Sequence, residues 1–112
     1  MKTILLLAAL VMSSVPVKAD DTRLLHRSKV VGALAFAECL VRKGEITEKQ
    51  AKELMNEYVS ENPELNAAYS WSLTSDKVSK AVQALVPHLS SDCGELTISE
   101  DEALRLAGPY MN

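Results

Sequence analysis

The stretch VVGALAFAECLV, residues 30–41, carries a single charge, that of Glu38. It lies within a longer segment, Leu24 to Lys43, that predicts one helix. A helix that is apolar on every side must be covered on every side, so it belongs in the centre of a bundle. Four of its residues are small enough to let neighbouring helices approach closely: Gly32, Ala33, Ala35 and Ala37. We therefore expect this helix to form the middle of the fold, and Gly44 to end it as a C-terminal cap.

Thr47 begins the second predicted helix. The Thr47 hydroxyl can accept a hydrogen bond from the first turn while the Gln50 side chain reaches back to the Thr47 amide, which is a capping box. Apolar residues then follow at i, i+3, i+4, i+7 and i+8: Ala51, Leu54, Met55, Tyr58 and Val59. This spacing predicts an amphipathic helix whose opposite, charged face lies in solvent.

Asn62 and Pro63 separate the second helix from a third. Asn62 is expected to cap the third helix and Pro63 to lie in its first turn. The apolar stripe of this helix consists of four residues: Leu65, Ala68, Tyr69 and Leu73. By the helical period, Trp71 points to one side of that stripe. The helix is expected to end near Leu73.

Two more helices are predicted in the C-terminal third. Thr74 or Ser75 is expected to cap the first of them, whose apolar stripe is Val78, Ala81, Val82, Leu85 and Leu89. Pro87 falls inside this stripe and implies a kink or a break. Ser99 is expected to cap the last helix in a capping box with Glu102. No segment alternates long enough for a strand, so the sequence predicts an all-α fold, a compact bundle of four to five helices.

The N-terminal segment, Met1 to Ala19, has the features of a cleavable secretory signal peptide. Lys2 supplies a positive end, an apolar run extends from Ile4 to Met12, and Pro16 breaks the helix before the small residue Ala19. The apolar run is well short of the roughly 20 residues that cross a bilayer. We expect cleavage before Asp20, no stable membrane insertion afterwards, and a secreted or periplasmic location.

Removing 19 residues from 112 leaves 93, which suffices for a single helical domain at residues 20–112. The full chain has 12 basic and 15 acidic residues, for a net charge of −3. Because the signal segment holds Lys2 and Lys18 and no acidic residue, the processed chain carries −5. A negative net charge disfavours nucleic acid and anionic membranes as partners.

The chain has two cysteines, Cys39 and Cys93, and both lie beyond the cleavage point. Exported proteins meet an oxidising compartment, where such a pair is usually joined. We therefore expect one disulfide, which would link the end of the first helix to the end of the fourth.

Two turns echo each other in sequence. Gly44-Glu45-Ile46-Thr47 and Gly94-Glu95-Leu96-Thr97 each precede acidic residues and a helix, and each resembles the second half of an EF-hand loop. The positions of the oxygen ligands fall instead on residues such as Val41 and Leu89, which cannot hold calcium. We interpret both turns as a capping glycine, an apolar residue and a capping threonine between antiparallel helices.

Catalytic motifs are absent from the sequence: it has no nucleophile elbow, phosphate loop or His-Glu-x-x-His helix, and it indicates no cofactor. An alternative is a small enzyme or metal-binding protein that uses Cys39 and Cys93 with His26 and His88. These residues lack the local spacing of a zinc site, and a nucleophilic cysteine would have to remain unoxidised.

Tyr69 and Trp71 are the candidate contact residues. Trp71 lies off the apolar stripe between two serines, and tryptophan often anchors interfaces. The leading hypothesis is a non-enzymatic exported module that presents this surface to another protein or to a small apolar ligand. A periplasmic stress chaperone is a further alternative.

The export signal, the Gly-Glu-[Ile/Leu]-Thr turns leading into capped helices, and the single cysteine pair together form a pattern. This pattern resembles small exported helical proteins of cyanobacteria that have no assigned activity. The resemblance implies an exported helical protein and supplies no functional residues.

If the segment up to Ala19 is a cleaved signal, N-terminal sequencing of the exported protein will begin at Asp20. The same material is expected to show no free thiol with Ellman's reagent, because export brings the cysteine pair into an oxidising compartment. A chain that keeps Met1, or that has two reactive thiols, would contradict the export prediction.

Overall fold

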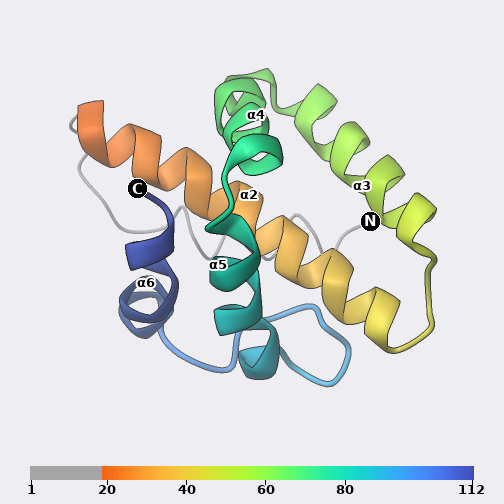
Figure 1. Ribbon diagram of the computed structural model, residues 1–112. Helices are drawn as coiled ribbons and strands as arrows, with labels where there is room; N and C mark the ends of the chain where they lie inside the picture. Colours follow the sequence, from red (N-terminus) through yellow and green to blue (C-terminus); the bar gives the residue numbers. More distant parts are fainter. Residues whose placement is uncertain (1–18) are drawn as a thin grey trace.

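The computed structural model describes residues 19–112 (Figure 1). Within this range the chain forms five α-helices, three short 3₁₀ helices and no β-strand, so the predicted all-α fold is confirmed. Residues 89 and 96 form an isolated antiparallel bridge. The predicted signal peptide, apart from its last residue, lies outside the described residues.

The five α-helices are α2 (Ala19–Arg42), α3 (Glu48–Glu61), α4 (Asn66–Thr74), α5 (Val78–Leu85) and α6 (Glu100–Ala107). Figure 1 shows α2 running through the middle, with α3 and α4 above it and most of α5 and α6 below. Helix α2 contacts α3, α4 and α5, and α6 packs on α5. The central position predicted for the apolar helix is therefore confirmed.

The core consists of two clusters of buried residues, one on each side of α2. The first cluster is Val30, Ala33, Phe36, Leu54, Met55, Tyr58, Val59, Leu65, Ala68 and Cys93. The second cluster is Val31, Ala35, Val78, Ala81, Val82, Leu85, Ala103, Ala107 and Met111. Because α2 contributes to both clusters, its sequence must place apolar residues on both of these sides.

Gly44 ends α2 as predicted. Its φ of +73° lies in the left-handed region, which glycine enters without a steric penalty. The Gly44 N–H donates to the Val41 carbonyl at 2.9 Å and the Glu45 N–H donates to the Leu40 carbonyl at 3.0 Å. This pair of bonds is a Schellman motif, which satisfies carbonyls that the helix end would otherwise leave open.

Helix α3 agrees closely with the sequence prediction. Both halves of the capping box are present, since the Gln50 N–H donates to the Thr47 hydroxyl and the Thr47 N–H donates to the Gln50 side chain. The predicted stripe faces the core, where Leu54, Met55, Tyr58 and Val59 are buried. Burial raises the pKa of Tyr58 to about 12, and the nearby carboxylate of Glu64 adds to the shift.

The region after α3 departs from the prediction at Asn62, Pro63 and Leu73. Asn62 caps the end of α3, because its side-chain amide donates to the Tyr58 carbonyl at 2.9 Å, and its side chain does not cap the next helix. Pro63 opens a 3₁₀ helix, η1 (Pro63–Leu65), before α4 begins. Leu73, predicted to face inward, is 70% exposed. The prediction for Leu73 was wrong because Ala68 and Trp71 both pack inward, and at about 100° per residue Leu73 lies about 140° and 160° around the helix from them.

Helix α5 begins without the predicted side-chain cap. The Thr74 hydroxyl donates back to carbonyls of α4, and Ser75 accepts only from the Lys77 N–H, one residue before the helix. Its stripe is buried as expected up to Leu85. The helix stops there and gives way to a 3₁₀ helix, η2 (Val86–His88), so Pro87 breaks the helix instead of kinking it.

The second of the two similar turns differs from the first. Gly94 does not have a positive φ and caps no helix, while Cys93 before it has a φ of +64°. Thr97 donates to the His88 carbonyl through both its N–H and its hydroxyl, so it ties the loop to η2 and caps nothing. The interpretation of this turn as a helix cap was therefore wrong.

Ser99 caps α6 by accepting from the Glu102 N–H at 3.2 Å, as predicted. The carboxylate of Glu102 does not complete the box, because it accepts from Arg105 one turn further along the helix. Hydrogen bonds from Arg105 lower the pKa of Glu102.

Met111 lies in the core. After η3 (Gly108–Tyr110), this residue is 2% exposed within the second cluster. Arg27 of α2 donates to the Met111 carbonyl at 2.7 Å, which fastens the last residues beside the first half of α2. In the part of the chain that the structure describes, no helix combines the length and the apolar character needed to span a bilayer.

Met111 stabilises the fold although it is the penultimate residue. Met111→Ala would leave a cavity in the second cluster, and we expect it to lower the free energy of unfolding by about 2 kcal/mol or more. Urea denaturation monitored by circular dichroism would measure the change. Leu73→Ala is the matched control, with an expected change within about 0.5 kcal/mol. Equal losses in the two variants would contradict the packing of the chain end.

Candidate functional site

A disulfide joins Cys39 of α2 to Cys93, which confirms the predicted pairing. The two Cα atoms are 5.8 Å apart and the bond spans 54 residues of sequence. Cys93 lies in the loop five residues beyond η2, so the bond reaches past the end of the fourth predicted helix. Since the chain has only these two cysteines, neither thiol is free.

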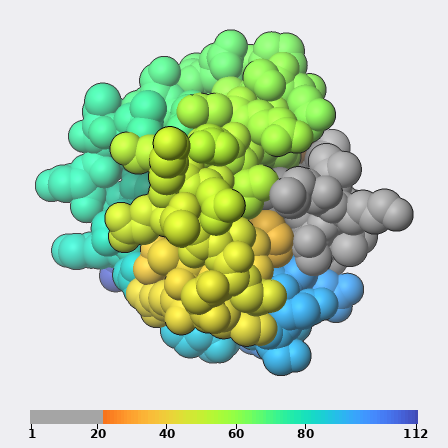
Figure 2. Space-filling view, turned by 90° about the vertical axis from the view of Figure 1, so that its right-hand side faces the viewer, coloured from red at the N-terminus to blue at the C-terminus, as the bar shows by residue number. Residues whose placement is uncertain are grey.

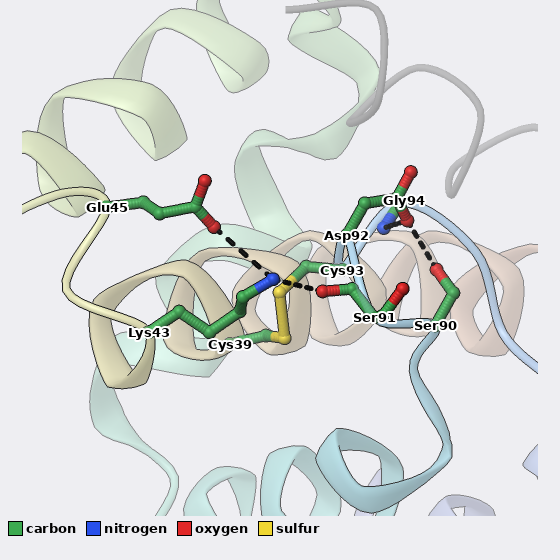
Figure 3. Close-up of polar contacts among 8 residues, drawn as sticks. All are labelled: Cys39, Lys43, Glu45, Ser90, Ser91, Asp92, Cys93 and Gly94. Atoms are coloured by element: carbon green, nitrogen blue, oxygen red, sulfur yellow. Dashed lines mark hydrogen bonds and ion pairs between the residues drawn. A yellow bond between two sulfur atoms is a disulfide. The ribbon is translucent and has the colours of Figure 1, made fainter.

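Lys43, the first residue after α2, holds the same loop. Its ammonium group donates to the Ser91 carbonyl and pairs with the Glu45 carboxylate at 3.6 Å (Figure 3). Figure 2 shows the chain after α2, in yellow, beside the light-blue loop at the lower part of this face. We call the disulfide and the Lys43 contact together the clasp.

The loop has its own hydrogen-bond framework. The Asp92 carboxylate accepts from the Ser90 hydroxyl at 2.6 Å and from the Gly94 N–H at 3.0 Å. These two bonds lower the pKa of Asp92, with a small contribution from Lys43. The Ser90 N–H donates to the Glu95 carbonyl at 2.8 Å, and this bond joins the segment before Cys93 to the segment after it.

A second surface of interest is the outer side of α4. No residue of this helix is charged, although 24% of the whole chain is. Its exposed residues are Asn66, Ala67, Ser70, Leu73 and Thr74, and we call them the α4 face. Among the residues that the structure describes, Leu73 is the large hydrophobic residue that is exposed to solvent.

Tyr69 and Trp71, the predicted contact residues, leave α4 in different directions. Tyr69 packs against the first cluster and its hydroxyl donates to Asn56 at 3.1 Å. Trp71 packs against the second cluster. Both side chains are partly exposed, so they flank the α4 face without forming one patch.

Arg27 covers one face of Trp71. Its guanidinium carbon lies 4.4 Å from the ring centroid, which is within the range of a cation–π contact. Burial, with a smaller contribution from Arg23, lowers the pKa of Arg27. Arg27 therefore joins Trp71 to the chain end at Met111, and Trp71 is held in a fixed orientation.

His26 and His88 do not assemble with the cysteines. His26 precedes Cys39 by 13 residues on the same helix, which places them about 20 Å apart along its axis. His88 ends η2, and of the groups that lower the pKa of Glu102 it contributes least. Among residues 19–112, no group of three or more His, Cys, Asp or Glu side chains is placed to hold a metal ion.

Comparison with models of protein families, with curated proteins and with solved structures gives no match. Function must therefore be inferred from the surfaces themselves. The clasp offers a disulfide that can exchange with thiols, and the α4 face offers an uncharged helix surface for docking.

Two of the residues that define these surfaces were not predicted to be functional. Lys43 lies four residues after Cys39, and this spacing places them on the same side of a helix, so the signal was present. Leu73 was predicted to face the core, and its exposure follows from the inward packing of Trp71.

The disulfide is expected to supply a large part of the stability. The double variant Cys39→Ala/Cys93→Ala should lose about 4 kcal/mol of unfolding free energy, because the unfolded chain is no longer closed into a long loop. Urea denaturation of both proteins would measure this loss. Lys43→Met, which removes only the exposed half of the clasp, is expected to cost about 1 kcal/mol or less. A double variant as stable as the native protein would show that the loop is held without the bond.

Proposed function

We propose that this chain is an exported, non-enzymatic binding module that contacts another protein through the α4 face. The observation that carries the proposal is the 70% exposure of Leu73 on a helix without charged residues. Exposed helices of a chain with this many charged residues usually display charge, as α3 does. An uncharged outer side is suited to burial against a partner, because no ion has to be desolvated.

The surroundings of Leu73 support a role in binding. The Tyr69–Asn56 hydrogen bond and the Arg27–Trp71 contact fix the two aromatic side chains that flank the α4 face. A surface that is already ordered loses little conformational entropy when a partner binds. Leu73 would then be the anchor of the contact.

A protein is favoured over a small apolar ligand as the partner. Sites for small molecules are concave and enclose most of the ligand. The α4 face is the outward side of a helix, and small polar side chains surround Leu73 on it. Such a surface can be covered by a complementary protein surface but cannot enclose a small molecule.

The enzyme alternative is not favoured by the observed geometry. Both sulfur atoms are in the disulfide, which removes the proposed nucleophile, and His26 is about 20 Å from Cys39 along α2. Export is supported by the disulfide, since such bonds persist in oxidising compartments and are rare in reducing ones. It is also supported by the signal-peptide features before Asp20.

Replacing Leu73 should remove binding without unfolding the protein. Burying a leucine side chain is worth about 1.5 to 3 kcal/mol, so Leu73→Glu is expected to weaken the complex at least about tenfold. A photo-reactive leucine analogue at position 73 would be cross-linked in the exported fraction of the producing cells. We expect a discrete adduct that excess native protein abolishes and that excess Leu73→Glu protein leaves unchanged.

Position 60 provides the control for this experiment. Ser60 is exposed on α3, a helix whose outer side is charged, and the same probe there should not give that adduct. Absence of any adduct from position 73, or identical adducts from both positions, would show that the α4 face is not a binding surface.

A further inference from the structure

We propose that Cys39 is a site of reversible thiol modification. In this reaction the thiolate of a small external thiol attacks the Sγ atom of Cys39, and the bond between Cys39 and Cys93 breaks. A mixed disulfide forms at Cys39, and Cys93 leaves as a thiolate that then takes up a proton. One disulfide is exchanged for another, so the step needs no oxidant or reductant besides the thiol itself.

The two cysteine residues differ in exposure, and the direction of attack is argued from this difference. Cys93 is 0% exposed and belongs to the first cluster, whereas Cys39 is partly exposed at the edge of that cluster. Exchange requires an approach to the sulfur that is attacked, while the leaving sulfur needs no contact with the reagent. The structure therefore assigns Cys39 as the attacked atom and Cys93 as the leaving group.

The basic residues beside Cys39 are each paired with a carboxylate, Arg42 with Glu38 and Lys43 with Glu45. The carboxylate of Glu38 is neutralised by Arg42 at 2.9 Å, and Lys43 lies one turn beyond Cys39. The Lys43 ammonium is bonded to the Ser91 carbonyl, two residues before Cys93. A cation near the departing thiolate favours its formation.

The loop that carries Cys93 remains attached when the sulfur bond opens. The Lys43–Ser91 contact, the bridge between residues 89 and 96, and the two bonds from Thr97 to the His88 carbonyl do not involve sulfur. Cys93 is thus kept near Cys39 and can attack the mixed disulfide, which restores the original bond and releases the thiol. A small thiol is favoured over one in the active site of a protein, because Cys39 is only partly exposed.

The test uses the native, disulfide-bonded protein and reduced glutathione. After brief incubation the reaction would be quenched with acid, digested with pepsin and mapped by mass spectrometry. We expect the glutathionyl group on the Cys39 peptide in at least about tenfold excess over the Cys93 peptide. In urea the excess should disappear, because both sulfurs become accessible. A native reaction at Cys93, an equal distribution, or no reaction before unfolding would overturn the proposal.

Two single-cysteine variants give an independent measurement. In Cys93→Ser the remaining Cys39 thiol should react readily with Ellman's reagent, and in Cys39→Ser the Cys93 thiol should react at least about tenfold more slowly. Circular dichroism would establish that each variant is folded before its rate is compared. If Cys93 in a folded variant reacts as fast as Cys39, the difference in access is absent and the proposal fails.

Discussion

The whole structure depends on the need to cover an apolar helix on every side. Helix α2 places Val30 and Phe36 in one cluster and Val31 and Ala35 in the other, so neither side can face water. The remaining helices are arranged accordingly, with α3 and α4 contributing to the first cluster and α5 and α6 to the second. The molecule thus has two small hydrophobic clusters, and α2 lies between them and contributes to both.

The loop after η2 covers the boundary between the two clusters. Leu89 and Leu96 pack against both clusters, as does Leu34 of α2. The loop has little regular structure and cannot hold itself in place by a helical hydrogen-bond pattern. The clasp fixes it instead, through the disulfide at Cys93 and the contact between Lys43 and Ser91. A left-handed backbone at Cys93 is disfavoured for a residue with a Cβ atom, and these attachments maintain it.

Features that depend on nearby residues could be predicted from the sequence, and features that depend on long-range geometry could not. The capping box at Thr47, the cap at Gly44 and the stripe of α3 are set by spacing within one or two turns. The inward position predicted for Leu73 failed because the buried side of α4 is set by Ala68 and Trp71, which pack against different clusters. At about 100° per residue, Leu73 lies about 140° from Ala68 and about 160° from Trp71, on the outer side of the helix.

The same distinction holds for the candidate sites. The pairing of Cys39 with Cys93 could be predicted because the chain has two cysteines, whereas their unequal exposure comes from the packing of Cys93 in the first cluster. Nothing in the sequence near Met111 or Arg27 indicates that they meet, because 84 residues separate them. Contacts of this kind require the tertiary fold to be known.

The clasp and the α4 face share a core, which connects the two proposals physically. Cys93 belongs to the first cluster, and Leu65 and Ala68, on which α4 rests, belong to it as well. A single exposed leucine is common on protein surfaces and would mean little alone. Here the exposed leucine lies on an uncharged helix. This helix packs on the first cluster, which contains the buried Cys93 of the disulfide. Cys93 therefore belongs to the same packed cluster that supports α4 and Tyr69.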